Sequence, residues 1–202
     1  MKARHAQAGE NYEVFPDLPC EVTFAQLFRD KGITDKADKL GFQAAQVFRL
    51  ISMEYIKLYD GVLEALALFR KKGYRLWLLS NAQRVFTAYE LRHLKLEDQF
   101  DAVYISSDHG CRKPDIRFYQ ALIEEHGLDI SKALMIGNDR NTDIGGAKAA
   151  GLDTLYMHTN ITPPGQKEAD PSLLPGNTQE GCRHFEFEGS DWKALTKLIT
   201  EL

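Results

Sequence analysis

The chain has 202 residues, enough for one domain or for one domain with a small accessory lobe. Its 44% hydrophobic and 27% charged residues are typical of a soluble globular protein, and the net charge of −4 argues against a nucleic-acid partner. No apolar run approaches the roughly 18 residues of a membrane span, and residues 1–7 lack the apolar stretch of a signal peptide. Three scattered cysteines without metal-ligand spacing indicate reduced thiols and a cytoplasmic protein.

The N-terminal part of the chain has the apolar spacing of helices. This spacing predicts a first helix that ends near Gly32 and a second helix over residues 35–59. Asp60 and Gly61 then break the pattern.

From Gly61 onward the pattern alternates between helices and short apolar strands. Helices are expected over residues 62–73, 84–94, 116–126, 144–150 and 191–202, and strands over residues 74–79, 100–105, 133–136, 154–157 and, as a last edge strand, 183–188. Such alternation implies parallel pairing and a three-layer α/β sandwich. Residues 158–182 hold four of the seven prolines and are predicted to form a long irregular loop.

Three polar loops follow strands of this predicted sheet. They comprise residues 79–83, 111–115 and 137–143. Ligands of open parallel sheets bind at the carboxyl ends of the strands, so these loops are the candidate site.

The first loop contains Ser80 and Asn81. Ser80 and Gln83 have the spacing of a capping box, which is a purely structural role. The same hydroxyl, with backbone N–H groups at the start of a helix, also suits an anion such as phosphate. Ser80 and Asn81 are therefore candidate phosphate-binding residues.

The second loop contains Lys113, Pro114 and Asp115. Pro114 and Asp115 favour the start of a helix, and Lys113 on this interpretation is a solvated surface charge. In the alternative interpretation, Lys113 neutralises phosphate oxygens and orients an attacking carboxylate.

The third loop contains two acids four residues apart, Asp139 and Asp143. They could simply make the loop soluble, with Asp143 favouring the start of the next helix. Two carboxylates in one tight loop also suit Mg²⁺, which takes carboxylate oxygens, water and phosphate as ligands. Asn138 is a possible alternative to Asp139 in the first acidic position.

Together the three loops resemble motifs two, three and four of the haloacid dehalogenase-like (HAD) hydrolase superfamily. Ser80 matches the second motif, Lys113 the third, and Asp139 with Asp143 the fourth. The resemblance implies a Rossmann-like core at residues 60–202, preceded by a partial helical cap at residues 1–59. It also implies Mg²⁺ and hydrolysis of a small phosphorylated metabolite through an aspartyl-phosphate, by a monomer or homodimer.

The sequence departs from this family at the first motif, which is a strand ending in Asp-x-Asp that supplies the nucleophile. No Asp-x-Asp occurs anywhere in the chain. We therefore expect an N-terminally truncated enzyme that is inactive alone. The missing strand is central in the family, so we expect the sheet to split into two pairs of strands, 74–79 with 100–105 and 133–136 with 154–157. The run from Tyr12 to Phe15 is too short to replace it and is stopped by Pro16.

Two other functions are compatible with the same motifs. The 2-haloacid dehalogenases share the Ser-Asn and Lys-Pro motifs but use no metal; the repulsion between Asp139 and Asp143 in the absence of a cation argues against this reading. The chain could also be a non-catalytic remnant of the fold or a binding module.

Overall fold

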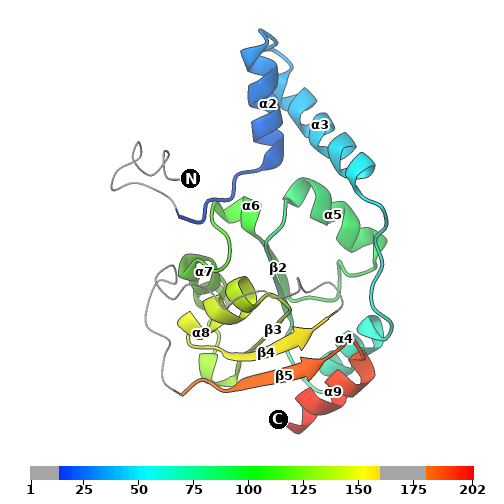
Figure 1. The fold of residues 1–202 in the computed structure, drawn as a ribbon, viewed down its shortest axis with the longest axis vertical. Coiled ribbons are helices and arrows are strands. Elements are labelled where there is room, and N and C mark those ends of the chain that lie inside the picture. The colour runs from blue at the N-terminus through cyan, green and yellow to red at the C-terminus, as the bar shows by residue number, and fades with distance from the viewer. Residues whose placement is uncertain (1–13, 160–180) are drawn as a thin grey trace.

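The computed structural model describes residues 14–159 and 181–202. Two helices form a hairpin at one end of the molecule, and two small parallel sheets with their covering helices form the body (Figure 1). None of the helices in these two ranges is long and apolar enough to cross a membrane.

The hairpin consists of α2 (Cys20–Asp30) and α3 (Ala37–Ser52). Small residues let the two helices approach closely: a Cβ on Gly41 would lie 2.6 Å from the backbone nitrogen of Ala25. The prediction that the second helix continues to residue 59 was wrong, because the chain becomes extended at Met53 and crosses from the hairpin back to the body.

The first sheet pairs β1 (Trp77–Ser80) with β2 (Ala102–Ile105) in parallel. The second sheet has three parallel strands in the order β3 (Leu134–Gly137), β4 (Asp153–His158) and β5 (His184–Glu188). Within the described ranges no strand joins β1 to β3. The predicted split is therefore confirmed, and β5 extends the second sheet as the expected edge strand.

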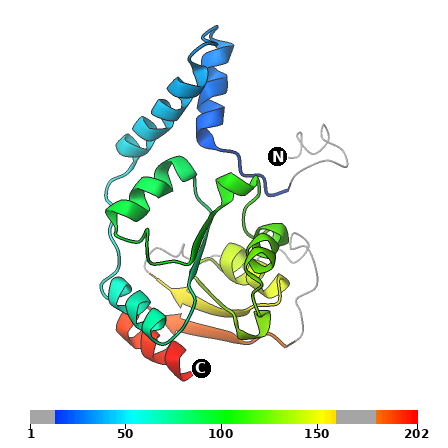
Figure 2. The same ribbon diagram turned by 180° about the vertical axis from the view of Figure 1, so that it is seen from behind.

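The helices cover the sheets on two sides (Figure 2). On one side α4 (Val62–Lys71) and α9 (Trp192–Glu201) pack on the second sheet through a core that contains Phe69, Leu155 and Leu195. On the other side lie α7 (Ile116–His126) and α8 (Gly146–Ala149). The arrangement is the expected three-layer α/β fold.

A second apolar core joins the two sheets in place of a strand. It contains Leu79 of β1, Tyr104 of β2 and the buried Phe118 of α7, with Met135 of β3 packed against it. A third core lies under α5 (Arg84–His93). The body is thus held together through α7 as well as through its strands.

Three local features differ from the sequence predictions. The helix predicted over residues 144–150 is a π-helical segment, η3 (Arg140–Gly145), followed by the short α8. The short helices α6 (Ser106–His109) and η2 (Ile130–Lys132) were not predicted.

The candidate strand at residues 12–15 falls partly outside the described residues. Within them, Val14 and Phe15 are bends, and Pro16 forms an isolated antiparallel bridge to Cys111. Most of the long loop predicted at residues 158–182 also lies outside the described ranges.

Candidate active site

Lys113 lies in the interior of the molecule. Its residue exposure is 6%, and its Nζ donates to the carbonyl oxygen of Leu79 at 2.7 Å and to Oδ1 of Asp143 at 2.6 Å. The interpretation of Lys113 as a solvated loop charge was therefore wrong. The ammonium group links the end of β1 to the loop that follows β3, at the carboxyl ends of both strands.

Asn81 fixes the backbone of Lys113 from the loop after β1. The Lys113 N–H donates to Oδ1 of Asn81 at 2.8 Å, and Nδ2 of Asn81 donates to the Lys113 carbonyl at 3.0 Å. This reciprocal pair of hydrogen bonds joins the first and second polar loops, so two of the three predicted loops meet directly.

Both oxygens of the Asp143 carboxylate are hydrogen-bonded. Its Oδ1 accepts from Lys113, and its Oδ2 accepts from the backbone N–H groups of Asn138 and Asp139 at 3.0 and 3.1 Å. The carboxylate fills the space beside Gly137, where any Cβ would overlap it. The sequence interpretation of Asp143 as a helix-favouring surface acid misses this buried ion pair.

Asp139 is the N-cap of η3. Its Oδ1 accepts from the backbone N–H groups of Asn141 and Thr142 at 2.9 and 2.7 Å, which satisfies donors that a helix start leaves open. Asn138 supplies its backbone N–H to Asp143 and its side-chain amide to Thr159 at 3.3 Å.

Ser80 is the last residue of β1 and is half-buried. The capping box predicted for it was wrong: the N-cap of α5 is Gln83, and the Gln83 side chain makes no capping hydrogen bond. Ala82 N–H and Arg84 N–H donate to the hydroxyls of Ser106 and Ser107, each at 2.9 Å. These two backbone donors near the start of α5 are therefore already used.

The residues present supply only part of a Mg²⁺ shell. Asp139 and Asp143 are the two carboxylates of the loop, and their oxygens accept the five hydrogen bonds from backbone N–H groups and Lys113 described above. Within residues 14–159 and 181–202, no group of three or more metal-binding side chains gathers. A Mg²⁺ site built from this set alone does not fit the ion's usual requirement.

A polar junction that sequence reasoning missed connects the hairpin to these loops. Oε1 of Gln83 accepts from the backbone N–H of Cys20 at 2.7 Å, and its Nε2 donates to Oδ1 of Asp17 at 2.8 Å. The fully buried Ser106 donates to Oδ2 of Asp17 at 2.5 Å. No local pattern marks Asp17, because its partners are 66 and 89 residues away.

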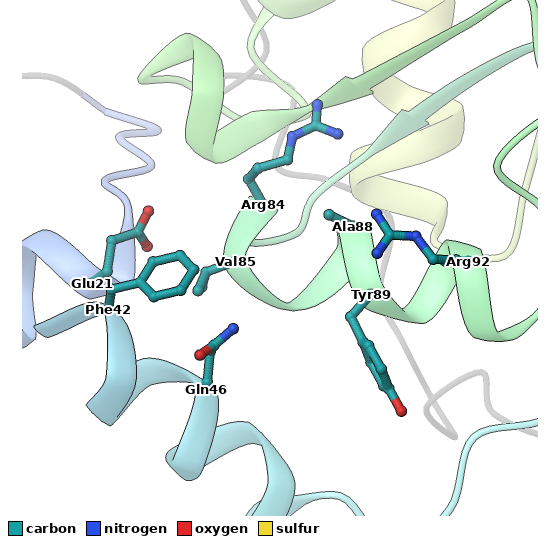
Figure 3. Close-up of a pocket in the computed structure, with 8 residues that line it drawn as sticks. All are labelled: Glu21, Phe42, Gln46, Arg84, Val85, Ala88, Tyr89 and Arg92. Atoms are coloured by element: carbon teal, nitrogen blue, oxygen red, sulfur yellow. The ribbon is translucent and has the colours of Figure 1, made fainter. Parts of the chain in front are cut away.

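A solvent-open pocket of about 320 Å³ lies between the hairpin and α5. Figure 3 shows Phe42 of α3 pointing toward Val85 of α5, with Gln46 between the two helices. Arg49 of α3 also pairs with Glu90 of α5 at 2.5 Å. None of the predicted site residues lines this pocket.

The sequence profile of the haloacid dehalogenase-like hydrolases matches residues 9–151. The chain belongs to this family. Similar curated proteins are phosphatases. The phosphoglycolate phosphatase of Mesorhizobium japonicum is 36% identical over 116 residues, which is 57% of this chain and 51% of that protein. The phosphoserine phosphatase of Thermus thermophilus is 27% identical over 171 residues, which is 82% of this chain and 68% of that protein.

Solved structures show the same fold at low identity. A magnesium-bound HAD-hydrolase, YfnB from Bacillus subtilis, is 22% identical with a TM-score of 0.60, covering 89% of this chain and 71% of that one. A 2-haloacid dehalogenase from Pseudomonas syringae is 22% identical with a TM-score of 0.61, covering 90% and 70%. The chain covers 51% and 41% of the lengths of two of the curated relatives, so it spans about half of each or less.

Proposed function

We propose that this chain carries the phosphate-binding and charge-neutralising part of a phosphatase that acts on small phosphomonoesters. Phosphatase chemistry is the family-level function of its curated relatives. The observation that carries the proposal is the buried Lys113 ammonium, held at the carboxyl ends of β1 and β3 by Leu79 and Asp143. A fixed, desolvated cation at this position suits a phosphate oxygen.

Lys113 retains donor capacity for a ligand. An ammonium group has three N–H donors, and two of them are directed at Leu79 and Asp143. The third is available to a phosphate oxygen. The Ser80 hydroxyl has no hydrogen-bond partner among the described residues and would supply a second contact. Asn81 acts indirectly, because its amide holds the backbone of Lys113 in place.

The covalent step requires a carboxylate that this chain does not provide. An aspartyl-phosphate mechanism needs an aspartate aligned with phosphorus, and the sequence has no Asp-x-Asp. Asp143 is already bound on both oxygens. We propose that a strand between β1 and β3 brings the nucleophile in the whole protein, and that residues 1–202 alone do not turn over phosphomonoesters.

Mg²⁺ binding by these residues alone is proposed to be weak. Asp139 and Asp143 are the candidate ligands, with Asn138 as the alternative, and both acids already have partners. Mg²⁺ would bind tightly only when further carboxylates coordinate it. Its chemistry, when bound, is to neutralise charge on the phosphoryl group. The proposed location is the cytoplasm, consistent with three cysteines that form no disulfide within the described residues.

Inorganic phosphate tests the binding role without requiring catalysis. We expect backbone amide resonances of Ser80, Asn81 and Lys113 to shift during an NMR titration of this chain with phosphate. Lys113→Gln should abolish the shifts, because it removes the cation. Lys132→Gln is the matched control, since Lys132 forms an exposed pair with Asp129 on the η2 segment. Equal phosphate-induced shifts in all three proteins would refute the role of Lys113.

One alternative function, metal-independent dehalogenation of 2-haloacids, is also compatible with the structure. From the sequence alone, repulsion between Asp139 and Asp143 without a cation disfavours it. In the structure, however, Lys113 neutralises Asp143 and backbone N–H groups bind Asp139. A halide-release assay with a 2-haloacid and a chelator, run beside the phosphate-release assay on the whole protein, separates the two reactions. A non-catalytic binding module would show neither.

A further inference from the structure

We propose that Tyr119 is a positioning residue that holds the acidic loop against Lys113. This inference rests on the proposed function of the Lys113–Asp143 pair. Tyr119 lies on α7, is 1% exposed, and its hydroxyl donates to the carbonyl oxygen of Thr142 at 2.5 Å. The carbonyl oxygen of Asp143 lies 3.2 Å from the same hydroxyl.

The contacts place Tyr119 on the backbone of the residue that pairs with Lys113. Lys113, which precedes α7, donates a hydrogen bond to the Asp143 carboxylate. Tyr119 donates to the carbonyl oxygen of Thr142, the residue before Asp143. The segment from Lys113 to Tyr119 therefore touches the loop at two points, one on the side chain of Asp143 and one on its backbone. Two fixed points determine where the carboxylate lies better than one does.

Two glycines make room for this arrangement at either end of η3. At Gly137 the missing Cβ leaves space for the Asp143 carboxylate. At Gly146 a Cβ would lie 2.6 Å from the ring of Tyr119 and 2.7 Å from its hydroxyl oxygen. Because Gly137 and Gly146 have no side chain, the backbone can approach the Asp143 carboxylate at one position and the Tyr119 ring at the other.

The hydroxyl is not needed for packing alone. Phe118, the neighbour of Tyr119, is fully buried in the same apolar core without a polar group. A buried hydroxyl is unfavourable unless it is hydrogen-bonded, so its presence needs a partner, and the loop carbonyls supply it. Burial, and then the charges of Asp143 and Asp139, raise the pKa of Tyr119 well above 10, which keeps it a donor.

A double-mutant cycle in thermal unfolding tests the coupling. We expect Tyr119→Phe to lower Tm by about 2–4 °C in the wild-type chain, the usual effect of losing one hydrogen bond in a chain of this size. In the Lys113→Met background the same change should lower Tm by less than half as much, because the pair that Tyr119 positions is already broken. Asp143→Asn provides an isosteric second background if Lys113→Met does not fold.

Tyr104→Phe is the matched control. Tyr104 is also a buried tyrosine of the same apolar core, but its hydroxyl donates to Glu125, away from the acidic loop. Its effect on Tm should be the same in both backgrounds.

The amide resonances of Asn138 and Asp139 give a second readout, since both N–H groups donate to Asp143. They should shift in Tyr119→Phe and stay in place in Tyr104→Phe. Additive Tm changes together with unmoved amide resonances in Tyr119→Phe would overturn the inference and leave Tyr119 as a packing residue. Neither readout depends on phosphate binding or turnover, so the proposed function can fail separately.

Discussion

Lys113 and Asp143 form a buried ion pair with 2.6 Å between Nζ and Oδ1, and their side chains are 7% and 10% exposed. The pair lies between β1 and the loop after β3, and no other strand joins β1 to β3 within the described residues. Lys113 also bonds the Leu79 carbonyl of β1, so one ammonium group ties the first sheet to the loop that leaves the second. The same contact organises the candidate phosphate site and joins the two halves of the body.

Removing Lys113 should destabilise the chain strongly. Lys113→Met leaves the Asp143 carboxylate buried without its cation, which costs about 3–5 kcal/mol in the free energy of unfolding. Lys132→Met at the exposed pair with Asp129 should change it far less, because solvent screens that pair. Urea unfolding of both variants measures the difference. Equal, small effects would show that the Lys113 pair is not buried in solution.

Gly137→Ala should displace Asp143. The added methyl group would occupy the space of the Asp143 carboxylate, so overpacking and a weakened ion pair together should cost roughly 3 kcal/mol. Gly127→Ala is the control: Gly127 has φ 55 and no atom within 4 Å of the added Cβ, so only backbone strain of about 1 kcal/mol is expected. Equal stability of the Gly137→Ala and Gly127→Ala proteins would contradict the close approach of Gly137 to the Asp143 carboxylate.

Cys20 should be a slow nucleophile. Burial, followed by the adjacent Glu21 charge, raises the pKa of Cys20 from 9.0 to about 11. The folded chain then holds on the order of fiftyfold less Cys20 thiolate at pH 9 than the unfolded chain does. Alkylation rates across pH 7–11, followed by mass spectrometry, test this. Glu21→Gln should shift the midpoint down but not fully back to 9.0, because burial remains. A folded-state midpoint at 9.0 would disprove the shift.

The junction at Asp17 should hold the hairpin to the body. Asp17→Ala removes the acceptor of the half-buried Gln83 amide and of the buried Ser106 hydroxyl, at a cost of about 1–3 kcal/mol. Hydrogen exchange of α2 should become faster, while β3 and β4 stay protected. Asp38→Ala on the exposed face of the hairpin is the control. Unchanged exchange of α2 in Asp17→Ala would show that the junction does not restrain the hairpin.

The fold was largely predictable because its signals are local. Residues 116–126 were predicted as a helix with the bounds that the structure gives, since an Asp cap and a following glycine mark both ends. The split of the sheet was predicted because the sequence lacks the first-motif strand that ends in Asp-x-Asp. The contacts of η3 were not predictable, because Tyr119 and Lys113 reach this loop from more than twenty residues away.

The sequence predicts which candidate residues lie near one another better than it predicts their contacts. Lys113, Asn81 and Asp143 were chosen from their positions at strand ends, and the structure brings these three together. Burial decides what Lys113 and Asp143 do, and a single sequence does not show burial at a loop. For the same reason the sequence is equally compatible with Lys113 as a solvated surface charge. Gln83 was assigned to a cap, whereas its side chain binds Asp17 and the hairpin.

Phosphate release tests the central claim most directly. Residues 1–202 with Mg²⁺ are compared with the same chain lengthened at its N-terminus by an apolar strand ending in Asp-x-Asp, across a panel of small phosphomonoesters. We predict no turnover above background for the first protein, because positioning without the nucleophile gives too little acceleration of a very slow reaction. The lengthened chain should turn over, and Lys113→Ala should abolish that activity. Clear turnover by residues 1–202 alone, lost in Lys113→Ala, would contradict the account.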